Sequence, residues 1–85
     1  MATNAELTEQ VREIMATSLG LDESDLPDDV TQATCGAWSS LQHLALMVSI
    51  EERFGVQLAM NDMAEMTSMA RIVGTVQRYL APATV

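Results

Sequence analysis

The sequence is poor in the residues that carry metal, disulfide or nucleic-acid chemistry. Its 85 residues include one cysteine, Cys35, and one histidine, His43. No internal disulfide can form, and the usual ligand set of a zinc site is incomplete. The four basic residues, all arginine, stand against twelve acidic residues and give a formal net charge of −8. A surface of this sign repels phosphate backbones, so we expect no nucleic-acid partner.

Two further absences concern membranes and export. No apolar run approaches the ~20 residues that a membrane-spanning helix requires. No charged segment followed by an apolar one at the N-terminus resembles a signal peptide, so we expect a cytoplasmic protein without a membrane span. Aromatic residues are limited to Trp38, Phe54 and Tyr79, whereas methionine occurs seven times. The core is therefore predicted to contain many adaptable thioether side chains.

What the chain does contain is helical spacing of apolar residues. Hydrophobic residues make up 48% of the sequence, which is enough to form the core of one small domain spanning residues 1–85. A first stripe predicts a helix over about residues 5–18, with Asn4 as its N-cap and Gly20 after its end. The residues of this stripe are Leu7, Val11, Ile14 and Met15.

Residues 20–38 lose this periodicity and contain five acidic residues. They predict a long loop with one helical turn near Asp22–Leu26. The acidic spacing lacks the glycine and the closing glutamate of an EF-hand calcium loop, so we exclude that kind of site. Loops of this length are often functional.

A second helix is predicted from Ser40 to Phe54, with Gly55 beyond its end. Ser39 as N-cap and Gln42 three residues later fit a capping box. Its apolar residues form two arcs, although one face suffices to reach a small core. The first arc contains Leu46, Met47, Ile50 and Phe54, and the second contains Leu41, Leu44, Ala45 and Val48. The second arc is therefore expected to meet another element of the fold, another protein or a bound guest. Since Glu51 and Glu52 border it, it is a reasonable docking surface.

In the last third of the chain, one or two helical turns are predicted at Asn61–Glu65, with Asn61 as their cap. A final helix follows, with Thr67 or Ser68 as its cap and its end before Pro82. The apolar stripe of the final helix contains Met69, Ile72, Val73, Val76 and Leu80. No strand alternation is visible, so we predict an all-α bundle of three main helices and a minor one.

The candidate nucleophiles favour a role other than catalysis. Ser40 and His43 lie three residues apart on one predicted helix, but no acidic residue is nearby in sequence to orient the histidine. We therefore interpret His43 as a solvated or half-buried helix residue, and Cys35 as a small buried or loop thiol. A serine at a helix start does favour an attached anion, because backbone N–H groups and the positive end of the helix dipole face it.

The segment "GAWSSLQHLALMVSIEERFGV" resembles the core motif of acyl carrier proteins, which is usually Gly-x-Asp-Ser-Leu followed by an apolar helix and a Glu-Glu pair before Phe. Ser40 and Leu41 match the Ser-Leu of that motif. Glu51–Phe54 match its acidic end, and Thr67 and Ser68 match the Thr-rich cap of the family's last helix. The resemblance covers nearly the whole chain.

This resemblance implies a small four-helix bundle with three longer helices, one short helix and a long loop between the first and second. It implies that Ser40 carries 4′-phosphopantetheine, added from coenzyme A by a phosphopantetheinyl transferase, and that Ser39 is the helix cap. Such a protein is a non-catalytic, monomeric carrier of thioesters. Its partners are acyl-loading and acyl-using enzymes such as a ligase, a synthase or an acyltransferase. The partner-facing residues on this mapping are Leu41, Leu44, Ala45, Val48, Glu51 and Glu52.

Several positions depart from the family pattern. Ser39 stands where the family usually has Asp, and Gln42 and Ala45 stand where many fatty-acid carriers have acids. Arg53 replaces a third glutamate, and Trp38 before the motif is more typical of carriers in secondary metabolism. These departures imply a dedicated carrier with its own partners. The alternatives are an unmodified interaction domain, an aminoacyl or peptidyl carrier, and a small hydrolase that uses Ser40 and His43.

Overall fold

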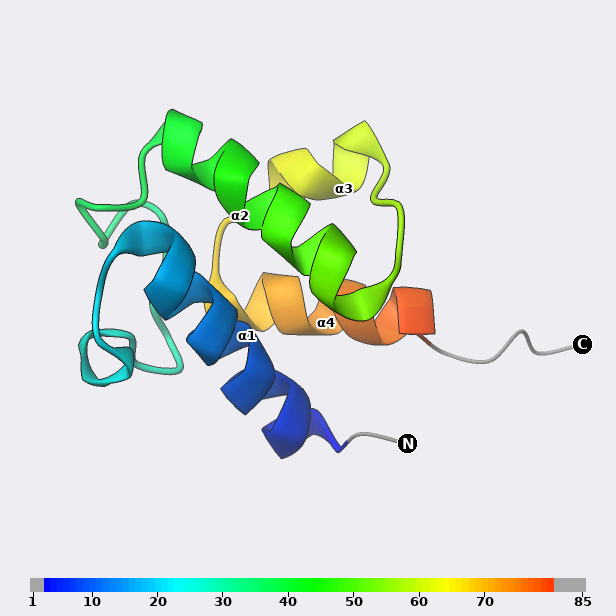
Figure 1. The fold of residues 1–85 in the computed structure, drawn as a ribbon, viewed down its shortest axis with the longest axis horizontal. Helices are drawn as coiled ribbons and strands as arrows, with labels where there is room; N and C mark the ends of the chain where they lie inside the picture. Colours follow the sequence, from blue (N-terminus) through cyan, green and yellow to red (C-terminus); the bar gives the residue numbers. More distant parts are fainter. Residues whose placement is uncertain (1–2, 81–85) are drawn as a thin grey trace, which may run out of the picture.

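The computed structural model describes residues 3–80 and consists of helices joined by loops (Figure 1). The elements in chain order are α1 (Asn4–Leu19), the 3₁₀ turn η1 (Glu23–Asp25), α2 (Ser40–Phe54), α3 (Met60–Glu65) and α4 (Met69–Leu80). Within this part of the chain the β-type pairing is a single isolated bridge between Thr31 and Ser68. The prediction of an all-α bundle with three longer helices and one short helix is confirmed.

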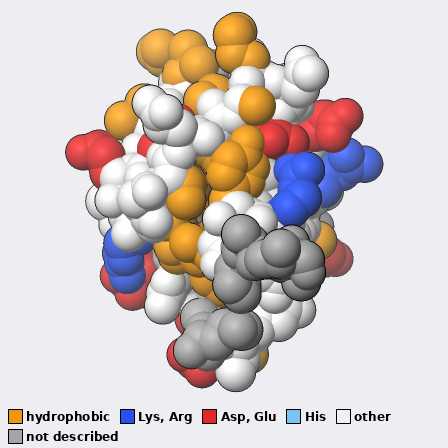
Figure 2. Space-filling model, turned by 90° about the vertical axis from the view of Figure 1, so that its right-hand side faces the viewer, with side chains coloured by type: hydrophobic (Ala, Val, Ile, Leu, Met, Phe, Trp, Pro, Cys, Tyr) orange, Lys and Arg blue, Asp and Glu red, His pale blue; other side chains and the backbone are white. Residues whose placement is uncertain are grey.

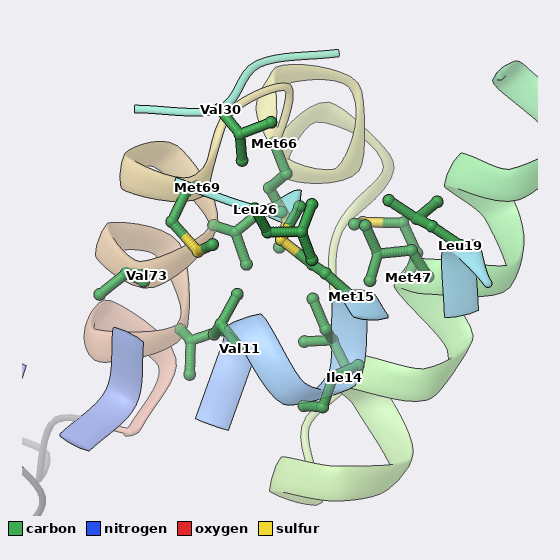
Figure 3. Packing of buried hydrophobic residues seen from close by; sticks show 14 of the residues in the cluster. Val11, Ile14, Met15, Leu19, Leu26, Val30, Met47, Met66, Met69 and Val73 are labelled. Atoms are coloured by element: carbon green, nitrogen blue, oxygen red, sulfur yellow. The ribbon is translucent and has the colours of Figure 1, made fainter. Parts of the chain in front are cut away.

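Helix α1 contacts both α2 and α4, whereas α3 lies next to α2 at the top of the view in Figure 1. The core is formed by the apolar stripe of α1, one face each of α2 and α4, and side chains from the loops (Figure 3). Four methionines, from α1, α2, the end of α3 and the start of α4, reach this core and are at most 1% exposed: Met15, Met47, Met66 and Met69. The prediction of a core rich in thioethers is confirmed.

Helix α1 begins one residue earlier than predicted. Its N-cap is Thr3, whose hydroxyl accepts a hydrogen bond from the N–H of Glu6 at 3.1 Å. The prediction of Asn4 as the cap is wrong, because the Thr3 hydroxyl already satisfies the N–H of the first turn and Asn4 is the first helical residue. Gly20 ends the helix in the left-handed region with φ of 69°, as predicted.

Helix α3 also begins one residue early, at Met60, and its N-cap Ala59 has no side-chain acceptor. The prediction of Asn61 as its cap is therefore wrong; the N–H of Ala59 instead donates to the Tyr79 hydroxyl at 2.9 Å. Ser68 caps α4, because its hydroxyl accepts from the N–H of Arg71 at 3.1 Å. The predicted stop at Pro82 lies outside the described residues.

The loop between α1 and α2 is fastened at two places. The Arg12 side chain donates from Nε to the carbonyl of Leu26 at 2.9 Å and forms ion pairs with Glu9 and Asp28. Further along, the N–H of Gln32 donates to Thr67 O at 2.8 Å and the N–H of Met69 to Val30 O at 3.0 Å. The loop is thereby tied to α1 and to the start of α4, so the chain enters α2 from a defined position.

Across residues 3–80, none of the helices has the length and apolar character that a bilayer crossing demands.

Candidate functional site

The two adjacent serines occupy different positions at the start of α2. Ser39 is the N-cap, with extended backbone angles, and its hydroxyl accepts a hydrogen bond from the N–H of Gln42 at 3.2 Å. Ser40 is the first helical residue and is exposed. The Ser39 hydroxyl therefore caps the helix, whereas the Ser40 side chain is exposed at the N-terminus of α2.

The electrostatics of this helix end suit a negatively charged group on Ser40. The first backbone bond of α2 runs from the N–H of His43 to Ser39 O at 2.8 Å, so the N–H groups of Ser40 and Leu41 precede the intrahelical ladder. The first turn of α2 contains no acidic residue. The positive end of the helix dipole therefore lies at Ser40, and no carboxylate in the first turn reduces its positive potential.

One face of α2 is apolar and exposed. Leu41, Leu44 and Val48 are 76%, 61% and 52% exposed, and Ala45 on the same face is exposed as well. Figure 2 shows apolar side chains gathered at the top of the molecule, the side that α2 and α3 occupy in Figure 1. The opposite face of α2 reaches the core through its buried residues Leu46, Met47 and Ile50. Of the two apolar arcs of α2, one thus faces the core and the other is exposed on the surface.

The two glutamates beside this face point in different directions. Glu51 is half-buried, and its carboxylate accepts a hydrogen bond from the N–H of Leu58 at 2.8 Å, which holds the segment between α2 and α3. Glu52 is exposed and lines a cleft of about 350 Å³ between α1 and α2, together with Glu13 and Arg53. The position of Glu52 leaves it open to a partner, whereas one oxygen of Glu51 is used within the fold.

His43 connects the start of α2 to α3. The indole N–H of Trp38 donates to His43 Nδ1 at 3.0 Å, and His43 Nε2 lies 2.8 Å from the carbonyl oxygen of Met63. Because an indole nitrogen only donates, Nδ1 must be the acceptor and Nε2 must carry the proton. The neutral imidazole therefore donates to Met63 O and links three segments of the chain.

This arrangement opposes the use of Ser40 and His43 as a nucleophile and base. Both ring nitrogens of His43 are engaged, one by Trp38 and one by Met63, and neither bond involves Ser40. Cys35 is half-buried against the core, and its carbonyl accepts a hydrogen bond from the N–H of Trp38 at 3.0 Å. Among the residues that the structure describes, no group of three His, Cys, Asp or Glu side chains is placed to hold a metal ion.

The chain of hydrogen bonds through His43 could not be predicted from the sequence. The partner on α3 is a backbone carbonyl twenty positions away, and a carbonyl has no signature in the sequence. The contact between Trp38 and His43 crosses the helix cap, so helical spacing does not indicate it either. The bond from Leu58 to Glu51 was missed for the same reason.

Two comparisons bear on this site. The family model described as "Phosphopantetheine attachment site" matches residues 9–76 of the chain. The chain is also similar to "Polyketide-8 synthase acyl carrier protein 2" of Streptomyces avermitilis, with 37% identity over 67 residues, which cover 79% of this chain and 74% of that protein. The matched region includes α2 and both of its N-terminal serines.

Proposed function

Since this chain belongs to the family of carrier domains with a phosphopantetheine attachment site, we propose that Ser40 is its attachment residue and that it delivers acyl groups to partner enzymes. Members of this family carry 4′-phosphopantetheine covalently. The observation that carries the assignment is the contrast at the start of α2: the Ser39 hydroxyl caps the helix, whereas Ser40 is exposed at its positive end.

The residues present fit a phosphodiester at this position. Ser40 would supply the oxygen that bonds to phosphorus, while the pyrophosphate bond of coenzyme A breaks and the adenosine bisphosphate leaves. The exposed N–H groups and dipole of α2 would stabilise the negative charge that the product retains. The bound group ends in a thiol, which holds an acyl chain as a thioester. Apart from Ser40, which accepts the group, the chain's own residues would present the acyl chain to partner enzymes and take part in no bond-making step.

The exposed face of α2 supports a carrier that meets several enzymes in turn. We assign Leu41, Leu44, Ala45, Val48 and the two flanking glutamates to partner contact. The transferase would meet this face first, followed by acyl-loading and acyl-using enzymes. We further propose that residues 1–85 act as one monomeric domain. The similarity to a polyketide carrier supports specialised acyl metabolism rather than primary fatty-acid synthesis.

A mass measurement tests the attachment. The purified protein is incubated with coenzyme A and a broad-specificity phosphopantetheinyl transferase, and the intact mass is recorded beside a known carrier as positive control. We expect a gain of one phosphopantetheine in the wild type and no gain in Ser40→Ala.

Ser39→Ala is the matched control for this experiment. It should still be modified and should lose about 1 kcal/mol of stability with its helix cap. A wild type that gains no mass while the control carrier does would favour an unmodified interaction domain, the alternative that the replacement of Asp by Ser39 suggests. Modification of Ser40→Ala would refute the assignment of the residue.

A further inference from the structure

Helix α3 is held in place mainly through its ends. None of its six residues is fully buried, and Met63 is its half-buried apolar residue that packs against the core. At its N-terminal end the Tyr79 hydroxyl accepts from the N–H of Ala59 at 2.9 Å and donates to Asp62 at 2.5 Å. Arg78 also donates to Asp62 at 2.7 Å. These bonds, that from Tyr79 above all, hold the pKa of Asp62 below its usual value.

The C-terminal end of α3 is joined to α2 by His43. Met63 O is one of the last carbonyls of this short helix, and it accepts from His43 Nε2 and, at 3.3 Å, from the N–H of Met66. The bond from His43 therefore ties a carbonyl at the negative end of α3 to the first turn of α2.

The same imidazole holds the turn that presents Ser40. Trp38 is 2% exposed, and its buried indole lies two residues before the proposed attachment serine. The planes of the indole and imidazole rings are inclined by 27°, and their centroids lie 6.0 Å apart. The position of the turn from Trp38 to Ser40 is thus connected to the position of α3 by two successive hydrogen bonds.

We propose that His43 is a positioning residue for the attachment reaction, because its bonds to Trp38 and Met63 keep the Ser40 turn and α3 in the single arrangement that the transferase binds. This inference rests on the proposed function. His43 forms no hydrogen bond with Ser40; it acts through the turn that contains the attachment serine and through α3.

The effect on the transferase's affinity depends on the fraction of the carrier that is in the arrangement able to bind the transferase. When that fraction falls, the apparent dissociation constant rises by the same factor, whereas the bound complex reacts as before. One neutral hydrogen bond corresponds to a factor of about 2 to 10 in such an equilibrium. Loss of the His43 bonds should therefore raise the transferase's KM for the carrier, by at most about 10-fold for each bond lost, and leave kcat unchanged.

Steady-state kinetics of the transferase on four variants test this. His43→Phe keeps an aromatic ring but removes both nitrogens, and Trp38→Phe removes the indole donor together with part of a buried ring. His43→Gln retains one acceptor and one donor, so it should restore much of the wild-type KM. Ser49→Ala is the matched control, because it removes a hydrogen bond of the same helix, from the Ser18 hydroxyl at 3.2 Å, on the side that faces α1. The control should keep the wild-type KM.

A spectroscopic measurement accompanies the kinetics. The chain has one tryptophan, so its indole N–H gives one proton–nitrogen NMR signal. In His43→Phe this signal should shift and its hydrogen exchange should accelerate, because the acceptor is gone. If His43→Phe does not fold, Trp38→Phe supplies the kinetic test, since it removes one bond and retains an aromatic side chain in the core.

The possible results separate this proposal from the one on which it rests. A wild type that is not modified at all refutes the attachment and the positioning role together. A modified wild type with the same KM in the folded His43 and Trp38 variants refutes the positioning role alone. A fall in kcat with unchanged KM also refutes it, as does an indole signal that His43→Phe leaves unchanged.

Discussion

The two faces of α2 should respond differently to truncation, and the comparison of Ile50→Ala with Leu44→Ala measures the difference. Ile50 is fully buried, whereas Leu44 is 61% exposed. Both residues belong to the same helix, six positions apart, so the substitutions affect similar backbone. Loss of a fully buried isoleucine leaves a cavity and costs about 2–5 kcal/mol of folding free energy.

The value for Leu44 follows from its exposure. Full burial of a leucine side chain contributes about 1.5–3 kcal/mol, and only about two fifths of this residue is covered. Truncation should therefore cost about 1 kcal/mol before the slightly better helix propensity of alanine offsets a few tenths. For a domain of this size, 1 kcal/mol corresponds to a shift of about 4–8 °C in Tm.

Urea unfolding followed by the fluorescence of Trp38 gives both values, because this single tryptophan is buried in the folded state. Circular dichroism at the helix band serves as the second probe. We expect Ile50→Ala to lose at least twice as much unfolding free energy as Leu44→Ala. Equal losses, or a loss above about 2 kcal/mol for Leu44→Ala, would place the outer arc in the core and remove the structural basis for a docking face.

Two further predictions concern the polar contacts that hold α3 and the long loop. Since the pKa of Asp62 is lowered in the folded state by its bonds to Tyr79 and Arg78, its ionised form should stabilise the protein above about pH 4, and this contribution should be lost as the pH falls below that value. Urea unfolding at about pH 6 and pH 3 measures the difference in unfolding free energy between wild type and Asp62→Asn. This difference should be smaller at the lower pH; an equal difference at the two pH values would contradict the stabilising role of the ionised carboxylate. Arg12→Met should lower the unfolding free energy by about 1–2 kcal/mol, because the bond to the Leu26 carbonyl is lost. It should also accelerate amide hydrogen exchange across residues 21–34. Unchanged exchange in this segment would show that the arginine does not hold the loop.

Local sequence signals predicted most of the helical architecture. The bounds of α2 follow from a serine at the N-cap, an apolar arc and Gly55, which adopts φ of 65° beyond the last turn. The long loop and its one helical turn follow from the loss of periodicity. These features depend on residues within a few positions of one another, which is the range that spacing can report.

The features that spacing did not predict depend on distant groups. Helix α3 starts at a residue without a side-chain cap, because its first N–H groups are satisfied in part by Tyr79, twenty positions beyond the cap. Glu51 and Glu52 are adjacent in sequence, yet one bonds a backbone N–H across a loop and the other lines a cleft. The position of His43 depends on a carbonyl of α3. Side-chain periodicity contains no information on such partners.

Ser39 and Ser40 are assigned different roles, and peptide sequencing by mass spectrometry shows which of the two is modified. All basic residues are arginine, so trypsin should release Glu13–Arg53 as one peptide that contains both serines. After treatment with coenzyme A and the transferase, fragmentation between Ser39 and Ser40 shows which residue carries the added group. We expect every fragment that contains Ser40 to gain the mass of phosphopantetheine and the fragments that end at Ser39 to keep their unmodified mass. A gain in the fragments that end at Ser39 would contradict this assignment.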